Sequence, residues 1–392
     1  MSLAPVAALA DAQDGRAASW VQQRVLLLLV LLAWWAAADL AFVSVAPNRV
    51  LTGTGVLLPA LMSGWRWGLL GPAALLCAAV WLPGGRGLNV SVALAATALL
   101  AGLLAVAGEE AARVAARESP LARVSLGGGF WALALLVWLA AADALQRLKL
   151  RPVGRALAFA GVLLPLAALL VSGALDQLSL LKEYANRQEV FHVAGWRHLQ
   201  IVFATLVPAL LIGVPLGVVA ARRERLARPL FALLNVIQTV PSIALFGLLI
   251  APLVALGLRG IGLLPAVVAL TLYALLPIVH GTVSGLQQVP ADALETATGM
   301  GLTPRQRFWR VEVPLALPVM LSGLRVTTVQ IVGLAVVAAL IGAGGFGALM
   351  FQGLFSSALD LVLLGALPVV ALAIVVDAGF ALLATALQRP ER

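Results

Sequence analysis

The feature that most constrains this chain is repeated along its whole length: apolar runs of about twenty residues, nearly free of charge. Charged residues make up 11% of the 392 residues, against roughly 25% in a soluble domain. The mean hydropathy is +1.04. Because a membrane-spanning backbone must satisfy its own hydrogen bonds, such runs form helices in lipid. We therefore predict an all-α, polytopic transmembrane protein.

The apolar runs define about ten predicted spans. The second is interrupted by "GWRWG" at 64–68, so it is either one bent helix or two short ones. The predicted spans are 25–46, 54–82, 88–108, 127–146, 155–176, 198–219, 230–256, 261–285, 317–341 and 360–386.

The net charge of +9 does not point to nucleic acid, because the basic residues lie in short loops between spans. There they act as topology signals, since cytoplasmic loops are enriched in Lys and Arg. With ten spans and both termini in the cytoplasm, sixteen of the 26 basic residues fall in cytoplasmic segments and eight outside. This orientation is the one we predict.

Several common kinds of site have no signature here. Cys77 is the single cysteine, so no disulfide forms within the chain. His192, His198 and His280 lack metal-ligand spacing, and we expect no metal site and no catalytic residues. No P-loop motif occurs, so the chain is not expected to bind or hydrolyse ATP by that route. No apolar h-region precedes residue 20, so the first run is read as an uncleaved span.

The least apolar passage of the second half is "LETATGMGLTPRQRFWRVEVPLALP", residues 294–318. Pro290 can open a helix, because its missing N–H is not needed there. Asp292 adds a favourable negative charge to the first turn. Gly301 predicts the end of this helix, since glycine tolerates positive φ.

A second short helix is predicted directly after Gly301. Thr303 is the expected N-cap, Pro304 takes the first helical position, and Gln306 completes a capping box. This arm carries basic and aromatic residues and is predicted to end before Pro314. Two short helices joined by a rigid turn would let a soluble partner grip a membrane protein. An amphipathic helix lying on lipid is the alternative.

These residues resemble the coupling loop of permease subunits of ATP-binding-cassette importers, whose pattern is E-A-A, three residues, Gly, nine residues, I-x-L-P. The spacing matches throughout, with Thr296 replacing the first Ala and valines replacing Ile and Leu. The resemblance implies a type I importer core whose loop docks into a separate ATPase subunit. The residues that match are Glu295, Thr296, Ala297, Gly301, Val311, Val313 and Pro314, supported by Thr303, Pro304 and Gln306.

Most of 230–355 is similar to the osmoprotectant branch, which imports glycine betaine, choline and proline betaine. The additional N-terminal spans resemble the long permeases of the low-affinity Gram-negative glycine betaine system. The resemblance implies a multi-pass protein of the bacterial inner membrane, with ATP and Mg used by the partner ATPase. The implied partners are ATPase subunits, a second permease subunit and a periplasmic substrate-binding protein.

The chain is predicted to divide near 180–197, where a polar stretch separates nondescript apolar spans from spans with informative loops. The predicted segments are a cytoplasmic tail (1–24), an extra transmembrane module of about five spans (25–180), a periplasmic connector (181–197), the permease core (198–386) and, within the core, the cytoplasmic coupling loop (287–316).

"GAGGFG" satisfies a dinucleotide-binding pattern, but it follows an apolar span rather than a strand. We expect its glycines to allow a tight turn or close helix packing near an outer gate; they are Gly342, Gly344, Gly345 and Gly347. Among ionisable residues within spans, Arg325 is expected to reach the interface. Asp377 lies deeper, where a helix contact is one use for it.

Three other functions fit the composition. A permease for another solute, such as an amino-acid-like one, would have the same loop. An ion-coupled secondary transporter would show inverted repeats and charges at the membrane midplane, and no repeat is visible. A membrane-embedded enzyme would need a cluster of His, Asp or Glu, which the sequence does not show.

Overall fold

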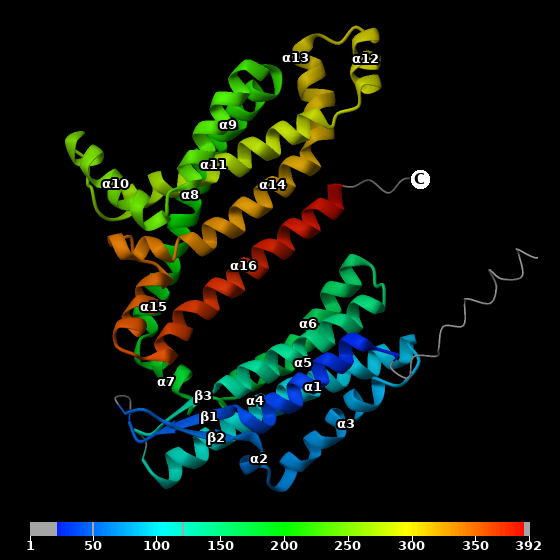
Figure 1. Cartoon of the computed structure of the whole chain (residues 1–392), viewed down its shortest axis with the longest axis vertical. Helices are drawn as coiled ribbons and strands as arrows, with labels where there is room; N and C mark the ends of the chain where they lie inside the picture. The colour runs from blue at the N-terminus through cyan, green and yellow to red at the C-terminus, as the bar shows by residue number, and fades with distance from the viewer. Residues whose placement is uncertain (1–21, 49–50, 120, 388–392) are drawn as a thin grey trace, which may run out of the picture. The chain divides into compact units, whose positions relative to one another are not determined.

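The computed structural model describes residues 22–48, 51–119 and 121–387, and most of them are helical (Figure 1). The chain forms two compact units, Met1–Lys182 and Glu183–Arg392. Most of the predicted cytoplasmic tail, residues 1–21, lies outside the described residues. Each unit is described by itself.

The first unit is built around one long helix, α4 (Arg86–Arg117). Two other apolar helices, α3 (Leu70–Ala79) and α5 (Gly128–Arg147), pack on it, and α1 (Arg24–Asp39) packs on α5 within the same core. α6 (Pro152–Val171) adds to the same core, and α7 (Ser179–Asn186) crosses the boundary between the units. Many of the buried residues of α4 are alanines, which allow neighbouring helices to approach closely.

A small antiparallel sheet, absent from our sequence prediction, also belongs to the first unit. Its strands are β1 (Ala41–Ala46), β2 (Thr54–Leu57) and β3 (Arg123–Leu126), in the order β2-β1-β3. Val43 pairs with Leu126 and Val45 with Val124. The β-branched and aromatic residues of "AFVSVA" favour this extended conformation over helix.

The sheet and the bends around it correct the predicted spans. The first prediction, 25–46, is a 16-residue helix followed by a strand. The second, 54–82, breaks into β2, α2 (Leu58–Leu61), a 3₁₀ turn η3 (Gly64–Leu69) and α3. Seven described helices are long and apolar enough to cross a membrane, or eight if one bent pair counts, so ten is approximate. Hydropathy does not register breakers such as Gly64, whose φ is +52°.

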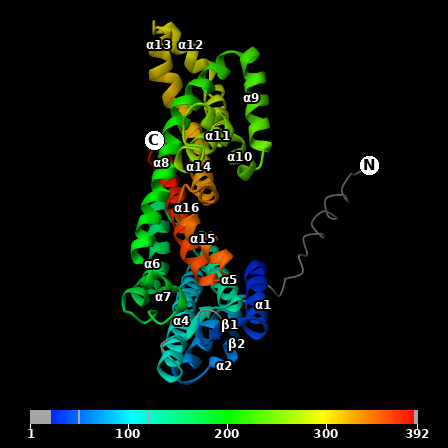
Figure 2. The same cartoon turned by 90° about the vertical axis from the view of Figure 1, so that its left-hand side faces the viewer.

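The second unit is entirely helical in its described part (Figures 1 and 2). Its elements are α8 (Gln188–Arg222), α9 (Glu224–Thr239), α10 (Ser242–Ala255), α11 (Leu263–Gln287), α12 (Ala291–Gly299), α13 (Pro304–Arg307), η4 (Phe308–Glu312), α14 (Val313–Leu334), η5 (Val337–Ile341), α15 (Phe346–Phe355) and α16 (Leu359–Leu387).

α11 is the central helix of this unit, and glycines set how closely its neighbours approach. A Cβ on Gly217 of α8 would lie 2.5 Å from Cβ of Thr282. Gly281 of α11 faces Gly323 of α14, where an added Cβ would lie 3.1 Å from the opposite Cα. Small residues permit this contact between backbones in lipid. Two sides of α11 are therefore buried, against α8 and α14.

The predicted span 230–256 is not a single straight helix. α9 and α10 meet at a bend of 106°, at Val240 and Pro241, because a residue before proline is driven out of the helical region. Side chains bridge the break to α11: Gln238 donates to the carbonyl of Tyr273 at 2.9 Å, and the Tyr273 hydroxyl donates to the Val240 carbonyl. Backbone groups freed by the bend thus find partners within the protein.

An ion pair joins α14 to α16. Arg325 donates through Nε and Nη2 to the two carboxylate oxygens of Asp377, at 2.5 and 2.7 Å. This parallel, two-bond geometry is the strongest that an arginine and a carboxylate form. Arg325 has its partner on a neighbouring helix, and Asp377 makes the helix contact that was one use expected for it; that Arg325 reaches the interface stays a prediction.

Candidate functional site

The predicted coupling loop lies between α11 and α14, where α12 and α13 stand side by side in both views (Figures 1 and 2). α12 begins directly after Pro290, which takes the N-cap position with an extended ψ of 137°. Glu295 and Thr296 are exposed on α12, whereas Ala297 is buried, with 4% of its surface accessible. The E-A-A position thus presents one carboxylate and one small polar residue outward and packs its last residue inward.

α12 ends at Gly301 in the way the sequence predicts. Gly301 has a φ of +78°, a left-handed conformation that favours glycine. The Leu302 N–H donates to the Ala297 carbonyl at 3.2 Å, and the Gly301 N–H donates to the Thr298 carbonyl at 3.0 Å. These two bonds form a Schellman motif, which satisfies the last carbonyls of the helix. The turn between the two arms is therefore a fixed structure.

The second arm begins with the predicted capping box. The Thr303 hydroxyl accepts from the Gln306 N–H at 3.3 Å, while the Gln306 side-chain oxygen accepts from the Thr303 N–H at 2.9 Å. Pro304 stands at the first helical position, as expected. Reciprocal bonds of this kind satisfy donors that a helix start would otherwise leave free.

The second arm does not end before Pro314, so that prediction is wrong. Residues Pro304–Leu334 form one continuous helix, with Val311, Val313 and Pro314 inside it. The segment η4 is a π-helical turn, in which the Val313 N–H donates to the Phe308 carbonyl five residues earlier. A wider turn makes room for a proline ring in the following residues, so the helix passes Pro314 without a stop.

A polar contact set that we did not predict holds the loop to the end of α8. Glu312 accepts from Arg307 Nε and from Arg222 Nη2, each at 3.2 Å. The Arg222 guanidinium also lies 4.9 Å from the centre of the Phe308 ring, and Arg307 donates to the Thr298 hydroxyl at 3.3 Å. One glutamate thereby links α8, α12 and η4. In the sequence, the feature that could have indicated these contacts is Glu312 itself, an acidic residue in an arm that otherwise carries basic residues.

The chain was compared with known proteins. The family model described as "Binding-protein-dependent transport system inner membrane component" matches residues 213–389, which include both arms of the loop. The osmoprotectant import permease protein OsmW of Salmonella typhimurium is 45% identical over 46% of this chain and 84% of its own length. Its counterpart OsmY is 40% identical over 57% of this chain and 91% of its own length. The chain belongs to this family of inner-membrane transport permeases.

Other comparisons agree with this assignment. The choline transport system permease protein OpuBB of Bacillus subtilis is 39% identical over 46% of this permease and 81% of its own length. Residues 22–181 match a second family model, described as the N-terminal domain of the ABC transporter permease YehY. The MetNI methionine ABC transporter in an inward-facing conformation aligns with 52% of this permease and 98% of its own chain, at 25% identity and a TM-score of 0.48. The sequence relatives and the two family models confirm the resemblance stated from the sequence, and the permease is a multi-pass membrane protein.

Three of the four glycines of "GAGGFG" form the turn between η5 and α15 of the permease, and the fourth, Gly347, lies in the first turn of α15. Gly342, Gly344 and Gly345 have φ values of +78°, +84° and +81°. A Cβ on Gly347 would lie 2.0 Å from the Val336 carbonyl oxygen. The element before the turn is a 3₁₀ helix, so this glycine pattern lacks the strand of a nucleotide site. The geometry explains the glycines by a tight turn and close packing, and a gating role stays a prediction.

Within the described part of the permease, no group of three or more His, Cys, Asp or Glu side chains could hold a metal ion. His198 is completely buried on α8, where its Nε2 lies 3.1 Å from the Val332 carbonyl of α14. His280, by contrast, is exposed on α11 and lies 3.4 Å from the Ser284 hydroxyl. The two histidines thus differ, and only His280 opens onto a cavity.

Proposed function

We propose that this chain is the membrane-spanning permease subunit of an ATP-driven importer of osmoprotectants such as glycine betaine. The solute class is inferred from one observation, sequence similarity. Relatives named for osmoprotectant and choline transport are 39–45% identical to this chain over the aligned residues. The chain itself catalyses no reaction in this proposal. A separate ATPase subunit binds ATP and Mg²⁺ and performs the hydrolysis.

The coupling role is assigned to the loop around Glu295. Its carboxylate is exposed on α12, a short helix whose C-terminal end is fixed by the Schellman turn and by the bond from Arg307, the partner of Glu312, to Thr298. Because these contacts make α12 rigid, a partner that pushes on it displaces the whole helix and does not merely deform a flexible loop. Because the second arm continues into α14 without a break, that movement reaches the membrane helices directly.

The proposed assembly has two permease subunits, two ATPase subunits and a periplasmic substrate-binding protein. The loop, residues 287–316, faces the cytoplasm, where the ATPase is found, and the connector at 181–197 faces the periplasm. The core at 198–386 carries the transport function, with the module at 25–180 attached to it. The excess of basic residues in the predicted cytoplasmic loops supports this orientation.

The first experiment tests the coupling loop. Replacing Glu295 by Lys reverses an exposed charge at the proposed contact, so the ATPase subunit should no longer co-purify with the permease. The matched control is Glu189→Lys, which reverses an exposed glutamate in the first turn of α8. Equal ATPase recovery from both variants would refute the coupling assignment.

The second experiment tests the solute. Uptake of radiolabelled glycine betaine is measured in a strain that lacks the chromosomal copy, with and without the plasmid-borne permease, at normal and raised osmolarity. The proposal expects uptake that depends on the permease. Absence of uptake at both osmolarities removes the osmoprotectant assignment but leaves the permease architecture, and amino-acid-like solutes would be tested next.

A further inference from the structure

The third side of α11 remains partly open, although the helix is buried against α8 and α14 on its other sides. Pro277, His280, Ser284 and Gln287 follow one another at spacings of three and four residues, so they lie on one face. His280 and Gln287 are exposed there. An apolar spanning helix thus carries the polar side chains of His280, Ser284 and Gln287 on one face, which α9 covers only in part.

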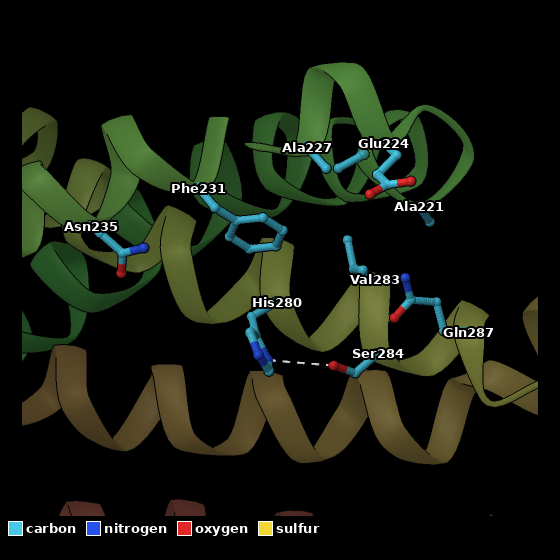
Figure 3. Close-up of a pocket in the computed structure, with 10 residues that line it drawn as sticks. Ala221, Glu224, Ala227, Phe231, Asn235, His280, Val283, Ser284 and Gln287 are labelled. Carbon is cyan, nitrogen blue, oxygen red and sulfur yellow. Dashed lines mark hydrogen bonds between the residues drawn. The ribbon is translucent and has the colours of Figure 1, made fainter. Parts of the chain in front are cut away.

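α9 and α14 turn matching polar faces toward this strip. Phe231, Asn235 and Gln238 share one face of α9, and Ser322 and Gln330 lie on α14. One cavity of about 630 Å³ lies between α8, α9 and α11, and another of about 530 Å³ lies between α9, α11 and α14. Both are lined by Phe231, Asn235, His280 and Ser284. Because the two cavities share these lining residues, they form one continuous groove. Figure 3 shows Phe231 of α9 pointing toward His280 of α11.

The groove is lined by a mixture of polar and apolar side chains and is almost free of formal charge. Among the described residues that line it, Glu224 is the one acidic residue, and it pairs with Arg228 at 3.0 Å. No lysine or arginine belongs to this described lining. The remaining polar groups are amides, hydroxyls and an imidazole. Because lipid tails offer such groups no hydrogen bonds, polar residues in spanning helices face water or protein.

We propose that the groove between α9, α11 and α14 is this subunit's wall of the solute passage, suited to small polar solutes without net charge. The assignment of the groove to the passage rests on geometry alone, whereas the solute class rests on the proposed function. A fixed positive or negative group at its centre would trap one end of a zwitterion and repel the other. Neutral donors and acceptors accept both ends in succession.

The lining is also suited to weak rather than tight binding of such a solute. The ring of Phe231 offers one aromatic face to a quaternary ammonium, and the amides and hydroxyls of Asn235, Ser284 and Gln287 offer hydrogen bonds to a carboxylate. Transport requires contacts that are favourable enough for entry and weak enough for release. One ring is not an aromatic cage, so the solute passes along the groove without being stored.

Cysteine accessibility tests the groove in the assembled transporter. In a Cys77→Ser background, Asn235, His280 and Ser322 are replaced singly by Cys, and membranes that contain the partner subunits are treated with a charged methanethiosulfonate. Co-purification of the ATPase verifies that each variant assembles. The control, Leu233→Cys, sits on α9 outside the groove and is 59% exposed in the isolated subunit. Groove cysteines should react about tenfold faster or more, since the reagent needs water, and excess glycine betaine should slow them.

The possible outcomes separate this inference from the proposed function. Reaction of the groove cysteines no faster than Leu233→Cys, in an assembled and transporting complex, would show that lipid or the second permease covers the groove and would overturn the inference. Fast reaction without glycine betaine uptake would keep the passage and remove only the solute assignment.

A charge substitution gives a second, independent test. His280→Lys puts a permanent positive charge at the centre of the groove, whereas His280→Gln keeps a neutral polar side chain. Uptake should fall about tenfold or more further in the Lys variant than in the Gln variant, because a like charge at close range repels the ammonium group. Equal uptake by the two variants, with the ATPase still bound, would overturn the inference.

Discussion

Arg66 in the first unit and Arg325 in the second are both arginines in apolar stretches, but their surroundings differ. Arg66 is 2% exposed and donates to the Leu61 carbonyl at 2.7 Å, with Glu109 and Glu110 at 3.3 and 3.6 Å. The side chains of Arg325 and Asp377 are 42% and 47% exposed, although they bind each other with ideal geometry. The first unit thus encloses Arg66 and Glu110, whereas the second leaves the Arg325–Asp377 pair half-exposed.

This difference separates two uses of polar residues in membrane helices. An enclosed cluster with every group paired fixes a structure and has nothing to offer a ligand. Open polar faces, such as the groove around His280, need water, solute or another subunit. The contrast is consistent with the proposal that the second unit carries the solute passage.

The largest expected effect comes from opening the enclosed cluster. Arg66→Ala removes the buried guanidinium and leaves buried Glu110 with Arg113 as its remaining ion-pair partner. Removing one member of a buried ion pair costs about 3–5 kcal/mol. The thermal midpoint of the detergent-solubilised protein, followed by size-exclusion chromatography, should fall markedly. The control is Arg113→Ala, since the Arg113 side chain is 38% exposed. If the thermal midpoint fell by the same amount in both variants, the exposure of an arginine would not determine its contribution to stability, and the contrast between the two units would not hold.

Overpacking the central helix of the second unit should have the next largest effect. In Gly323→Leu the new side chain meets the backbone of Gly281 at 3.1 Å, and overpacking of this kind costs about 1–3 kcal/mol. Both the thermal midpoint and glycine betaine uptake should decrease. Gly333→Leu on the same helix is the control, because nothing lies within 4 Å of its Cβ position. Tolerance of both substitutions would show that α11 and α14 are not held by close contact.

The half-exposed ion pair should contribute less. A double-mutant cycle with Arg325→Ala and Asp377→Ala should give a coupling free energy of about 1 kcal/mol, typical of polar contacts between membrane helices. Thermal unfolding of the four proteins in detergent supplies the values. A coupling close to that of the enclosed Arg66 cluster would remove the distinction between the two units.

The smallest effect is expected at the coupling loop, and it should be local. Thr303→Ala removes the hydroxyl of the capping box, which costs about 1 kcal/mol. Amide hydrogen exchange at Gln306 should accelerate about fivefold, which is the change in population that this free energy produces. Thr303→Ser retains the hydroxyl and should exchange at the original rate. Unchanged exchange in Thr303→Ala would mean that the arm is held by Glu312 instead.

The loop was predictable from the sequence because its chemistry is local. Gly301, Thr303 and Gln306 specify a turn and a cap within a few residues, and the structure contains both. The sheet of β1, β2 and β3 was not predictable in the same way. A run such as "AFVSVA" fits a helical span and a strand equally well by hydropathy, and its partner strand β3 lies far along the chain.

The groove and the Glu312 contacts depend on tertiary structure. Asn235, His280 and Ser322 are separated by about forty residues each in the sequence, and only the packing of α9, α11 and α14 brings them to one cavity. Likewise, Arg222 meets Glu312 across ninety positions. Each of these residues looks unremarkable when its own segment is considered.

The π-helical turn η4 sets the rotational phase of α14. Its wider turn accommodates one residue more than an α-turn would, and one residue corresponds to about 100° around a helix axis. Deleting a single residue from 308–312 would restore a regular helix but swing Ser322 and Gln330 away from the groove. The fixed interval between Gly301 and Val311 therefore sets how the two short arms of the loop are aligned with the face of α14 that lines the groove.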